Sequence, residues 1–251
     1  MPEVNTNVVL GLSLIIVIVS GGTALYLNLT TPMEEVESVS FVTNDGVEIV
    51  GTYFPSTGDE ALILIHMVGR DRNDWNKLAE ELNRAKYAVL SIDLRGHGES
   101  IYRDGKTIDW STFTEDDYNE MVLDIQAADD FLVTKGFNGR ISLIGGSIGA
   151  NLALNYASDH RNIKTVILLS PGLNYKGIET EDALINFGDR PILFITSNND
   201  PGSAESSLLL YSMSIGPKEI KVYNEAGHGT EILSQHDISI IILKWLETHT
   251  G

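Results

Sequence analysis

Short apolar runs alternate with amphipathic segments along most of this chain. Six runs are almost continuously hydrophobic, which is typical of strands in a parallel sheet covered on both faces: 61–65, 87–92, 141–144, 165–169, 192–196 and 219–223. The segments 73–86 and 115–134 place apolar residues at helical spacing. Further helices are predicted at 148–158, 204–213 and 230–248.

An antiparallel hairpin precedes these units. Residues 39–43 and 47–54 are rich in β-forming residues and flank Asn44-Asp45-Gly46, a hairpin turn signal. A hairpin followed by strand–helix units predicts an α/β domain with one mostly parallel, doubly wound sheet and helices on both faces. Any site should lie beyond the carboxyl ends of the strands.

The N-terminus has a different pattern, because residues 8–27 are all apolar or small. Twenty such residues are long enough to cross the hydrocarbon core of a membrane as a helix. No charged residue stands between Glu3 and Glu34, and no Lys or Arg precedes Arg70. We therefore expect residues 1–33 to form a membrane anchor, inserted through residues 8–27, and residues 34–251 to form the folded domain.

Two alternatives to an anchor stay open. A signal peptide cleaved near Gly22-Thr23-Ala24 would give a secreted protein, although the usual basic start is missing and Glu3 stands there instead. A buried core helix fits poorly, because it would be apolar on every face. We expect the folded domain to lie outside the cytoplasm, either anchored or secreted after cleavage.

Composition narrows the possible chemistry. Asp and Glu total 35 against 17 Lys and Arg, so the formal net charge is −18. This charge argues against nucleic acid as a partner, and against docking on anionic lipid through a basic patch. The chain has no Cys, which excludes disulfides, thiolate catalysis and Cys-ligated metal sites.

A candidate nucleophile follows the run 141–144. Gly145-Gly146-Ser147-Ile148-Gly149 has the G-x-S-x-G spacing and stands between a predicted buried strand and a predicted helix. Such a turn exposes the serine Oγ near the helix N-terminus. The alternative is a glycine-rich turn in which Ser147 only caps the helix.

A nucleophilic serine needs a base, and the base needs an orienting carboxylate. His228 lies between two glycines in the loop after 219–223, whereas His160, His236 and His249 lie on or near helices. Asp200 follows the strand 192–196, although it could be a turn residue before Pro201. Asp182 and Asp189 are the alternatives, but neither follows a buried strand.

The order Ser147, Asp200, His228 resembles that of the α/β-hydrolase superfamily, over a region from about Val36 to the end. Residues 93–100, which read DLRGHGES, are similar to a D-x-R-G-x-G-x-S loop common there. The resemblance implies a scaffolding role for this loop, including Asp93, Arg95 and His97.

The loop after 61–65 also resembles the superfamily. His66-Met67-Val68-Gly69 stands where relatives often have His-Gly-x-Gly. The match implies that the backbone N–H groups of Val68 and Ile148 form the oxyanion hole. Met67 replaces the usual glycine and is a fallback donor, and His66 would organise the loop.

The resemblance implies hydrolysis of a small or lipid-derived ester through an acyl-enzyme on Ser147. Neither a metal nor another cofactor is expected. Only 170–191, with a predicted helix at 181–187, is available as a cap, so we expect an open cleft and a modest acyl ester, as in carboxylesterases, lysophospholipases or acylglycerol lipases. Residues 101–114, with Tyr102, Trp110 and Phe113, are a candidate wall of the pocket. Thioester or amide hydrolysis, including peptidase activity, and a membrane-tethered, non-catalytic binding role remain the alternatives.

Overall fold

The computed structural model describes residues 14–20, 23–29 and 35–250. The chain divides into two compact units, residues 1–35 and residues 36–251. In the first unit, β1 (Leu14–Ser20) pairs with β2 (Thr23–Leu29) as an antiparallel hairpin.

This hairpin differs from the helix that the sequence predicts across residues 8–27. Every residue of β1 from Ile15 to Val19 is β-branched. Residues of this kind favour strands over helices. Residues 8–13 and 21–22 of the predicted span lie outside the described residues. In the part of the chain that the structure describes, no helix is both long and apolar enough to span a membrane.

The second unit is built on one large mixed sheet, as predicted. Its strand order is β14-β13-β10-β9-β5-β6-β4-β7-β8, and β3 lies off this path, paired with residues 48–53 of β4. The strands from β14 to β6 run parallel, whereas β4 is antiparallel to both β6 and β3. The strands are β3 (Glu37–Val42), β4 (Val47–Phe54), β5 (Ala61–Ile65), β6 (Ala88–Ile92), β7 (Tyr102–Arg103), β8 (Lys106–Thr107), β9 (Ile141–Gly146), β10 (Ile163–Leu169), β13 (Ile192–Ser197) and β14 (Lys218–Tyr223).

The central strand β5 shows why these runs are continuously apolar. All five of its residues are fully buried. Ile63 and Ile65 pack into the hydrophobic core on one face of the sheet, and Leu62 and Leu64 pack into the core on the other. Because successive strand side chains point to opposite faces, a strand covered on both faces needs apolar residues at every position.

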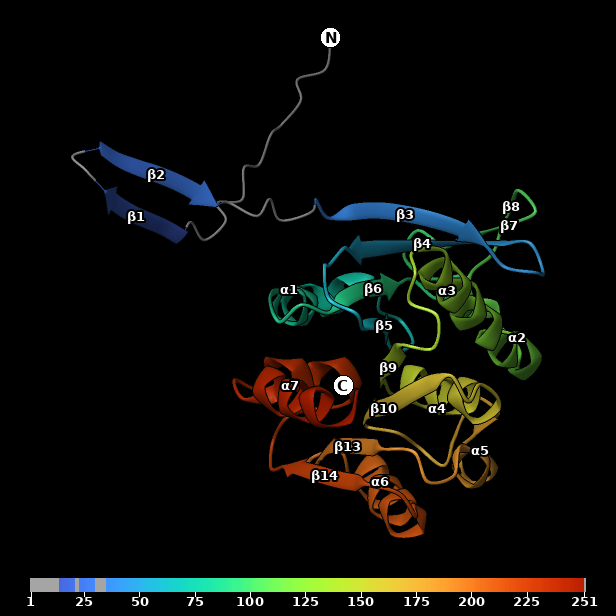
Figure 1. Cartoon of the computed structure of the whole chain (residues 1–251). Helices are drawn as coiled ribbons and strands as arrows, with labels where there is room; N and C mark the ends of the chain where they lie inside the picture. The colour runs from blue at the N-terminus through green and yellow to red at the C-terminus, as the bar shows by residue number, and fades with distance from the viewer. Residues whose placement is uncertain (1–13, 21–22, 30–34, 251) are drawn as a thin grey trace. The chain divides into compact units, whose positions relative to one another are not determined.

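Helices cover both faces of this sheet (Figure 1). Two helices pack into one core, α1 (Asn76–Arg84) and α7 (Ile238–His249). On the other face lie α3 (Val122–Thr134), α4 (Ile148–Asp159), α5 (Glu181–Phe187) and α6 (Pro201–Met213). This arrangement leaves the carboxyl ends of the parallel strands free to carry loops.

Some predicted helices are shorter than the sequence pattern indicates. The segment 115–134 forms two helices, α2 (Glu115–Asn119) and α3, with Glu120 and Met121 between them. The segments 73–86 and 230–248 each begin as a 3-10 helix, η1 (Arg72–Trp75) and η3 (Gly229–Ser234). Further short elements are η2 (Trp110–Thr112) and the hairpin of β11 (Asn174–Tyr175) with β12 (Ile178–Glu179).

Candidate active site

Ser147 lies on a sharp turn between β9 and α4. Its backbone has φ 54° and ψ −119°, in a region that residues other than glycine rarely adopt. A Cβ at Gly145 would meet the backbone of Gly149, and a Cβ at Gly149 would meet the carbonyl oxygen of Ile65. The two glycines thus let β9, α4 and β5 approach closely, as the G-x-S-x-G spacing predicts.

His228 lies within hydrogen-bond distance of both other candidate residues. Its Nε2 is 2.7 Å from Ser147 Oγ, and its Nδ1 is 2.6 Å from Asp200 Oδ2. A carboxylate can only accept, so Nδ1 carries the proton and Nε2 is free to accept from the Ser147 hydroxyl. The structure therefore joins Ser147, His228 and Asp200 in one continuous chain of hydrogen bonds.

Asp200 follows β13 and immediately precedes α6. Burial alone would raise the pKa of its carboxyl, but hydrogen bonds from Ser203 and His228 outweigh burial, and the pKa is lowered. Asp200 is therefore ionised at neutral pH and can stabilise an imidazolium at His228. Asp182 and Asp189, the alternative acids, have exposed side chains, and Asp182 lies on α5.

The loop that carries His228 is fixed by hydrogen bonds that the sequence pattern does not reveal. Asn199 Oδ1 accepts from the backbone N–H groups of Ala226 and Gly227, at 3.2 and 3.1 Å. Glu231 Oε2 accepts from the backbone N–H of His228 at 2.9 Å. Gly227 has φ 78°, which a side chain would strain. The imidazole thus approaches Ser147 from an anchored loop.

The expected oxyanion loop begins directly after β5. Its turn is closed by the backbone N–H of Arg70, which donates to Met67 O at 3.2 Å. The Met67 side chain lies beside the catalytic loop, since a Cβ at Gly229 would come within 2.7 Å of Met67 Sδ. Ile148 is the first residue of α4, a position whose N–H has no partner within the helix. The donor roles of Val68, Ile148 and Met67 stay predictions.

His66 organises this loop and is not placed as a base. Its Nδ1 donates to Met67 O at 2.8 Å, and its Nε2 accepts from the backbone N–H of Leu94 at 2.9 Å. The side chain is fully buried, and burial lowers its pKa to about 4. His66 is therefore neutral at physiological pH and ties the loop after β5 to the loop after β6.

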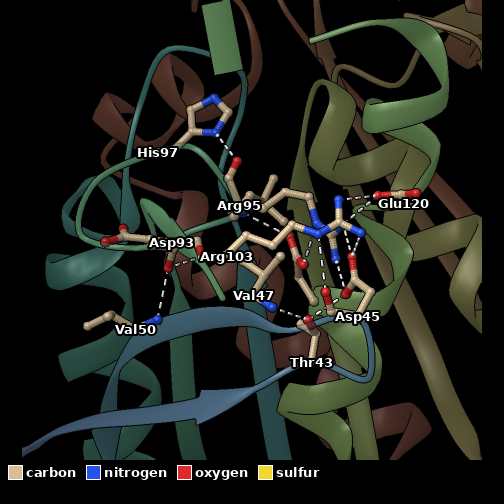
Figure 2. A network of polar contacts seen from close by, with 12 residues as sticks. Thr43, Asp45, Val47, Val50, Asp93, Arg95, His97, Arg103 and Glu120 are labelled. Atoms are coloured by element: carbon tan, nitrogen blue, oxygen red, sulfur yellow. Dashed lines mark hydrogen bonds and ion pairs between the residues drawn. The ribbon is translucent and has the colours of Figure 1, made fainter. Parts of the chain in front are cut away.

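The loop after β6 is held by a network of charged side chains (Figure 2). Arg95 is almost fully buried and contacts Asp45, Glu120 and Asp124 at 2.8 to 3.1 Å. Arg103 contacts Asp45 and Glu120 as well, both at 3.1 Å. These contacts connect the β3–β4 turn, the loop after β6 and the α2–α3 boundary, which is a scaffolding arrangement.

Trp110 forms one wall of a cavity beside the expected oxyanion loop. Its indole stacks on His97 with 5.1 Å between the ring centroids and lies close to Gly69. The cavity has a volume of about 380 Å³, and Ile101 and Ile108 contribute to its lining. Of the three aromatic residues expected to form the wall, Trp110 lines this cavity and Tyr102 and Phe113 do not, and that the cavity receives the substrate stays a prediction.

Two further side chains reach the His228–Asp200 pair without having been found from the sequence. Ser203 Oγ lies 3.2 Å from His228 Nδ1, and the Tyr175 hydroxyl lies 2.7 Å from Ser203 Oγ. Ser203 is three residues after Asp200 on a helix, so helical spacing gives a weak signal for it. No sequence motif around Tyr175, which lies in the β11–β12 hairpin, indicates that it contacts the site.

Solved structures of similar fold include an esterase from Pyrococcus furiosus, at TM-score 0.71 and 18% identity, covering 86% of this chain and 91% of that one. The esterase domain of a Rhodothermus marinus protein matches at TM-score 0.67 and 18% identity, covering 86% and 100%. An Exiguobacterium antarcticum esterase matches at TM-score 0.69 and 15% identity, covering 84% and 100%. At these identities the likeness concerns the fold.

A protein-family model gives the narrower assignment. The model described as "Serine aminopeptidase, S33" matches residues 57–187, just over half of the chain. The matched region contains the expected oxyanion loop, the loop after β6 and the Ser147 turn. The chain therefore belongs to the serine aminopeptidase S33 family of the α/β-hydrolase superfamily.

Proposed function

We propose that this protein is a serine hydrolase that cleaves carboxylic esters through an acyl-enzyme on Ser147. The observation that carries the proposal is the chain of hydrogen bonds from Ser147 Oγ to His228 Nε2, at 2.7 Å, and from His228 Nδ1 to Asp200, at 2.6 Å. A serine hydroxyl is a weak nucleophile until an adjacent base accepts its proton, and this geometry supplies such a base.

In the acylation step, Ser147 Oγ attacks the ester carbonyl carbon while His228 Nε2 takes the hydroxyl proton. Asp200 holds the ring and stabilises its positive charge. We assign the backbone N–H groups of Val68 and Ile148 to the oxyanion, where each such donor is worth about 3 kcal/mol. The tetrahedral intermediate then collapses, and His228 gives the proton to the departing alcohol oxygen.

Deacylation repeats these steps with water. His228 Nε2 takes a proton from the water as its oxygen attacks the acyl carbonyl of the Ser147 ester. The second tetrahedral intermediate expels Ser147 Oγ, which recovers its proton from His228. The products are a carboxylic acid and the free serine, so the scheme needs no other reactant.

The covering segment supports a modest ester as substrate. Between β10 and β13 there is room only for the β11–β12 hairpin and α5, and not for a lid of several helices. The esterases of similar fold add support for an ester over an amide. Carboxylesters, lysophospholipids and acylglycerols all fit this description.

Peptide or amide hydrolysis is a second candidate, because the matching family model is described as a serine aminopeptidase. The same nucleophile, base and acid would serve an amide.

For the cellular location, we propose that residues 8–27 attach the protein to a membrane, with the folded domain outside the cytoplasm.

The first test is labelling of the full-length chain with a fluorophosphonate probe, followed by peptide mapping. We expect labelling at Ser147 that disappears in Ser147→Ala. Ser212→Ala is a matched control, because Ser212 is exposed on α6 and its variant should label like the wild type. Nitrophenyl esters graded from acetyl to dodecanoyl, with aminoacyl nitroanilides beside them, then separate ester from amide hydrolysis.

The outcomes are distinct. Absence of labelling in a folded wild-type protein, or full labelling of Ser147→Ala, would contradict the nucleophile assignment. A labelled protein that cleaves the nitroanilides faster than every ester would move the function to the peptidase candidate.

A further inference from the structure

Tyr175 contacts the candidate active site from a hairpin that is not part of the large sheet. It is the last residue of β11, in the hairpin between β10 and α5 that covers part of the site. A Cβ at Gly172 would come within 2.5 Å of the Tyr175 ring, so glycine at that position makes room for it. The ring stands edge-on to the His228 imidazole, with 6.0 Å between the centroids.

The hydroxyls of Ser203 and Tyr175 extend the hydrogen-bonded chain that runs from Ser147 through His228 to Asp200. The Tyr175 hydroxyl lies 2.7 Å from Ser203 Oγ, which is 3.2 Å from His228 Nδ1. The Ser203 hydroxyl also donates to the Asp200 carboxylate, and this bond contributes to the lowered pKa of Asp200. Ser203 has only one proton to give. When Ser203 donates it to Asp200, Tyr175 donates to Ser203 at 2.7 Å, and the carbonyl oxygen of Ser170 is a more distant acceptor at 3.4 Å.

Burial strengthens the hydrogen bonds that Ser203 and Tyr175 make. Ser203 is 2% exposed, and water has little access to replace a lost partner. Hydrogen bonds in such surroundings polarise one another, so removing the outer donor weakens the inner bond. Besides the hydroxyls of Ser147 and Ser203, the groups beside His228 are Asp200 from the β13–α6 loop, Glu231 from η3, which accepts from the His228 backbone N–H, and the Tyr175 phenol from β11.

We propose that Tyr175 and Ser203 are positioning residues that hold the His228–Asp200 pair in its reactive arrangement, so that the β11–β12 hairpin completes the catalytic machinery. This inference rests on the proposed hydrolase function. Neither side chain exchanges a proton with the substrate. Each limits the positions of the carboxylate and the ring on which proton transfer from Ser147 depends.

The kinetic test uses Tyr175→Phe, which keeps the ring and removes only the hydroxyl, together with Ser203→Ala and the double variant. We expect kcat to fall about threefold to tenfold in Tyr175→Phe and about tenfold or more in Ser203→Ala, with KM within about twofold. The double variant should lose no more than Ser203→Ala alone, because Tyr175 acts through Ser203.

A spectroscopic readout tests the same contacts without turnover. The proton on His228 Nδ1 should give a downfield NMR resonance that shifts in Tyr175→Phe and in Ser203→Ala. Tyr156→Phe is a matched control, since the Tyr156 hydroxyl is also buried and donates to Asp129 at 2.6 Å. It should lower Tm while leaving both kcat and the resonance unchanged.

Unchanged kcat and an unchanged resonance in Tyr175→Phe would overturn the inference, as would additive losses in the double variant. A loss confined to KM would make Tyr175 a substrate contact and would also overturn it. These outcomes differ from failure of the proposed function, which would appear as a wild-type protein that is not labelled at Ser147.

Discussion

At Asp200, burial and hydrogen bonding act on the carboxyl in opposite directions. Burial favours the neutral acid, whereas the donors Ser203 and His228 favour the carboxylate and lower its pKa. The carboxylate in turn fixes which nitrogen of His228 carries the proton, and thus leaves the other free to face Ser147. A single charge therefore sets both the orientation and the tautomer of the expected base.

Replacing Asp200 with Asn should remove this control. An amide can donate to His228 Nδ1 and so favour the wrong tautomer, and we expect kcat to fall by about 10⁴-fold while the fold persists. Steady-state kinetics on a nitrophenyl ester will measure the loss. Asp182→Asn is the control, because that side chain is exposed on α5 and its variant should turn over normally. An Asp200→Asn enzyme as fast as wild type would rule out Asp200 as the orienting acid.

Single residues differ in how far the sequence alone could locate them. Ser147 and Asp200 each follow a buried strand, whereas His228 follows β14, which lies at the sheet edge and is only partly buried, unlike the fully covered strand that its apolar run predicts. The strands of a parallel sheet end at the same edge, so the meeting of the three residues could be anticipated. Asn199 and Tyr175 could not be found in this way. Asn199 contacts the His228 loop at Ala226, and Tyr175 contacts Ser203, over at least 27 residues of chain, and only the packed loops bring these groups together.

At the scale of elements, the loops after β5 and β6 support each other through two buried histidines. The His66 and His97 rings meet edge to face with 5.0 Å between the centroids. Burial lowers the pKa of both to about 4, and the neighbouring His66 further lowers that of His97. Both loops thus depend on neutral imidazoles, and one of them is the expected oxyanion loop.

This pair should make the folded state sensitive to acid. In the unfolded chain each imidazole binds a proton near pH 6.5, but in the folded protein only near pH 4. Between these values the unfolded state holds more protons, so stability falls as the pH is lowered. From pH 7 to pH 5 the free energy of unfolding should drop by about 2 kcal/mol per histidine.

Urea titrations at the two pH values will measure this drop. His97→Phe keeps a ring against Trp110 and should lose about 2 kcal/mol less than the wild type over the same interval. His236→Gln is the control, since His236 is exposed and its variant should behave like the wild type. Equal pH dependence in His97→Phe and wild type would refute the assignment.

Elements with a repeated pattern could be predicted, and the others could not. The strand β5 has the predicted bounds, because burial on both faces requires five apolar residues in a row. The hairpins β7–β8 and β11–β12 have strands of two residues, too short to show any period. Residues 8–27 fit a helix by length and hydrophobicity, but the described residues 14–20 and 23–29 form two strands, and the first of them is rich in β-branched residues.

On the scale of the whole molecule, the chain consists of a small N-terminal unit and a large unit that contains the candidate site. Residues 36–251 contain the sheet, both hydrophobic cores and every residue assigned to the site. Residues 1–35 form a separate unit that includes the β1–β2 hairpin. We therefore expect the larger unit to fold without the smaller one.

Removal of residues 1–33 should therefore leave Tm and the rate of labelling at Ser147 unchanged. If the N-terminal segment attaches the protein to a membrane, the full chain should sediment with membranes and the shortened chain should remain in the supernatant. Calorimetry, labelling kinetics and fractionation of both chains will measure these properties. A shortened chain that unfolds would show that the two units depend on each other, and a full chain in the supernatant would refute attachment.

The backbone of Ser147 has a consequence for how this protein can evolve. A φ of 54° costs a serine on the order of 1 kcal/mol or more, and a glycine would be relieved of most of that cost. The residue best suited to the turn is thus one that has no hydroxyl with which to attack a carbonyl. Selection for heat resistance and selection for turnover pull in opposite directions at this position, and added stability has to be sought elsewhere in the sheet and helices.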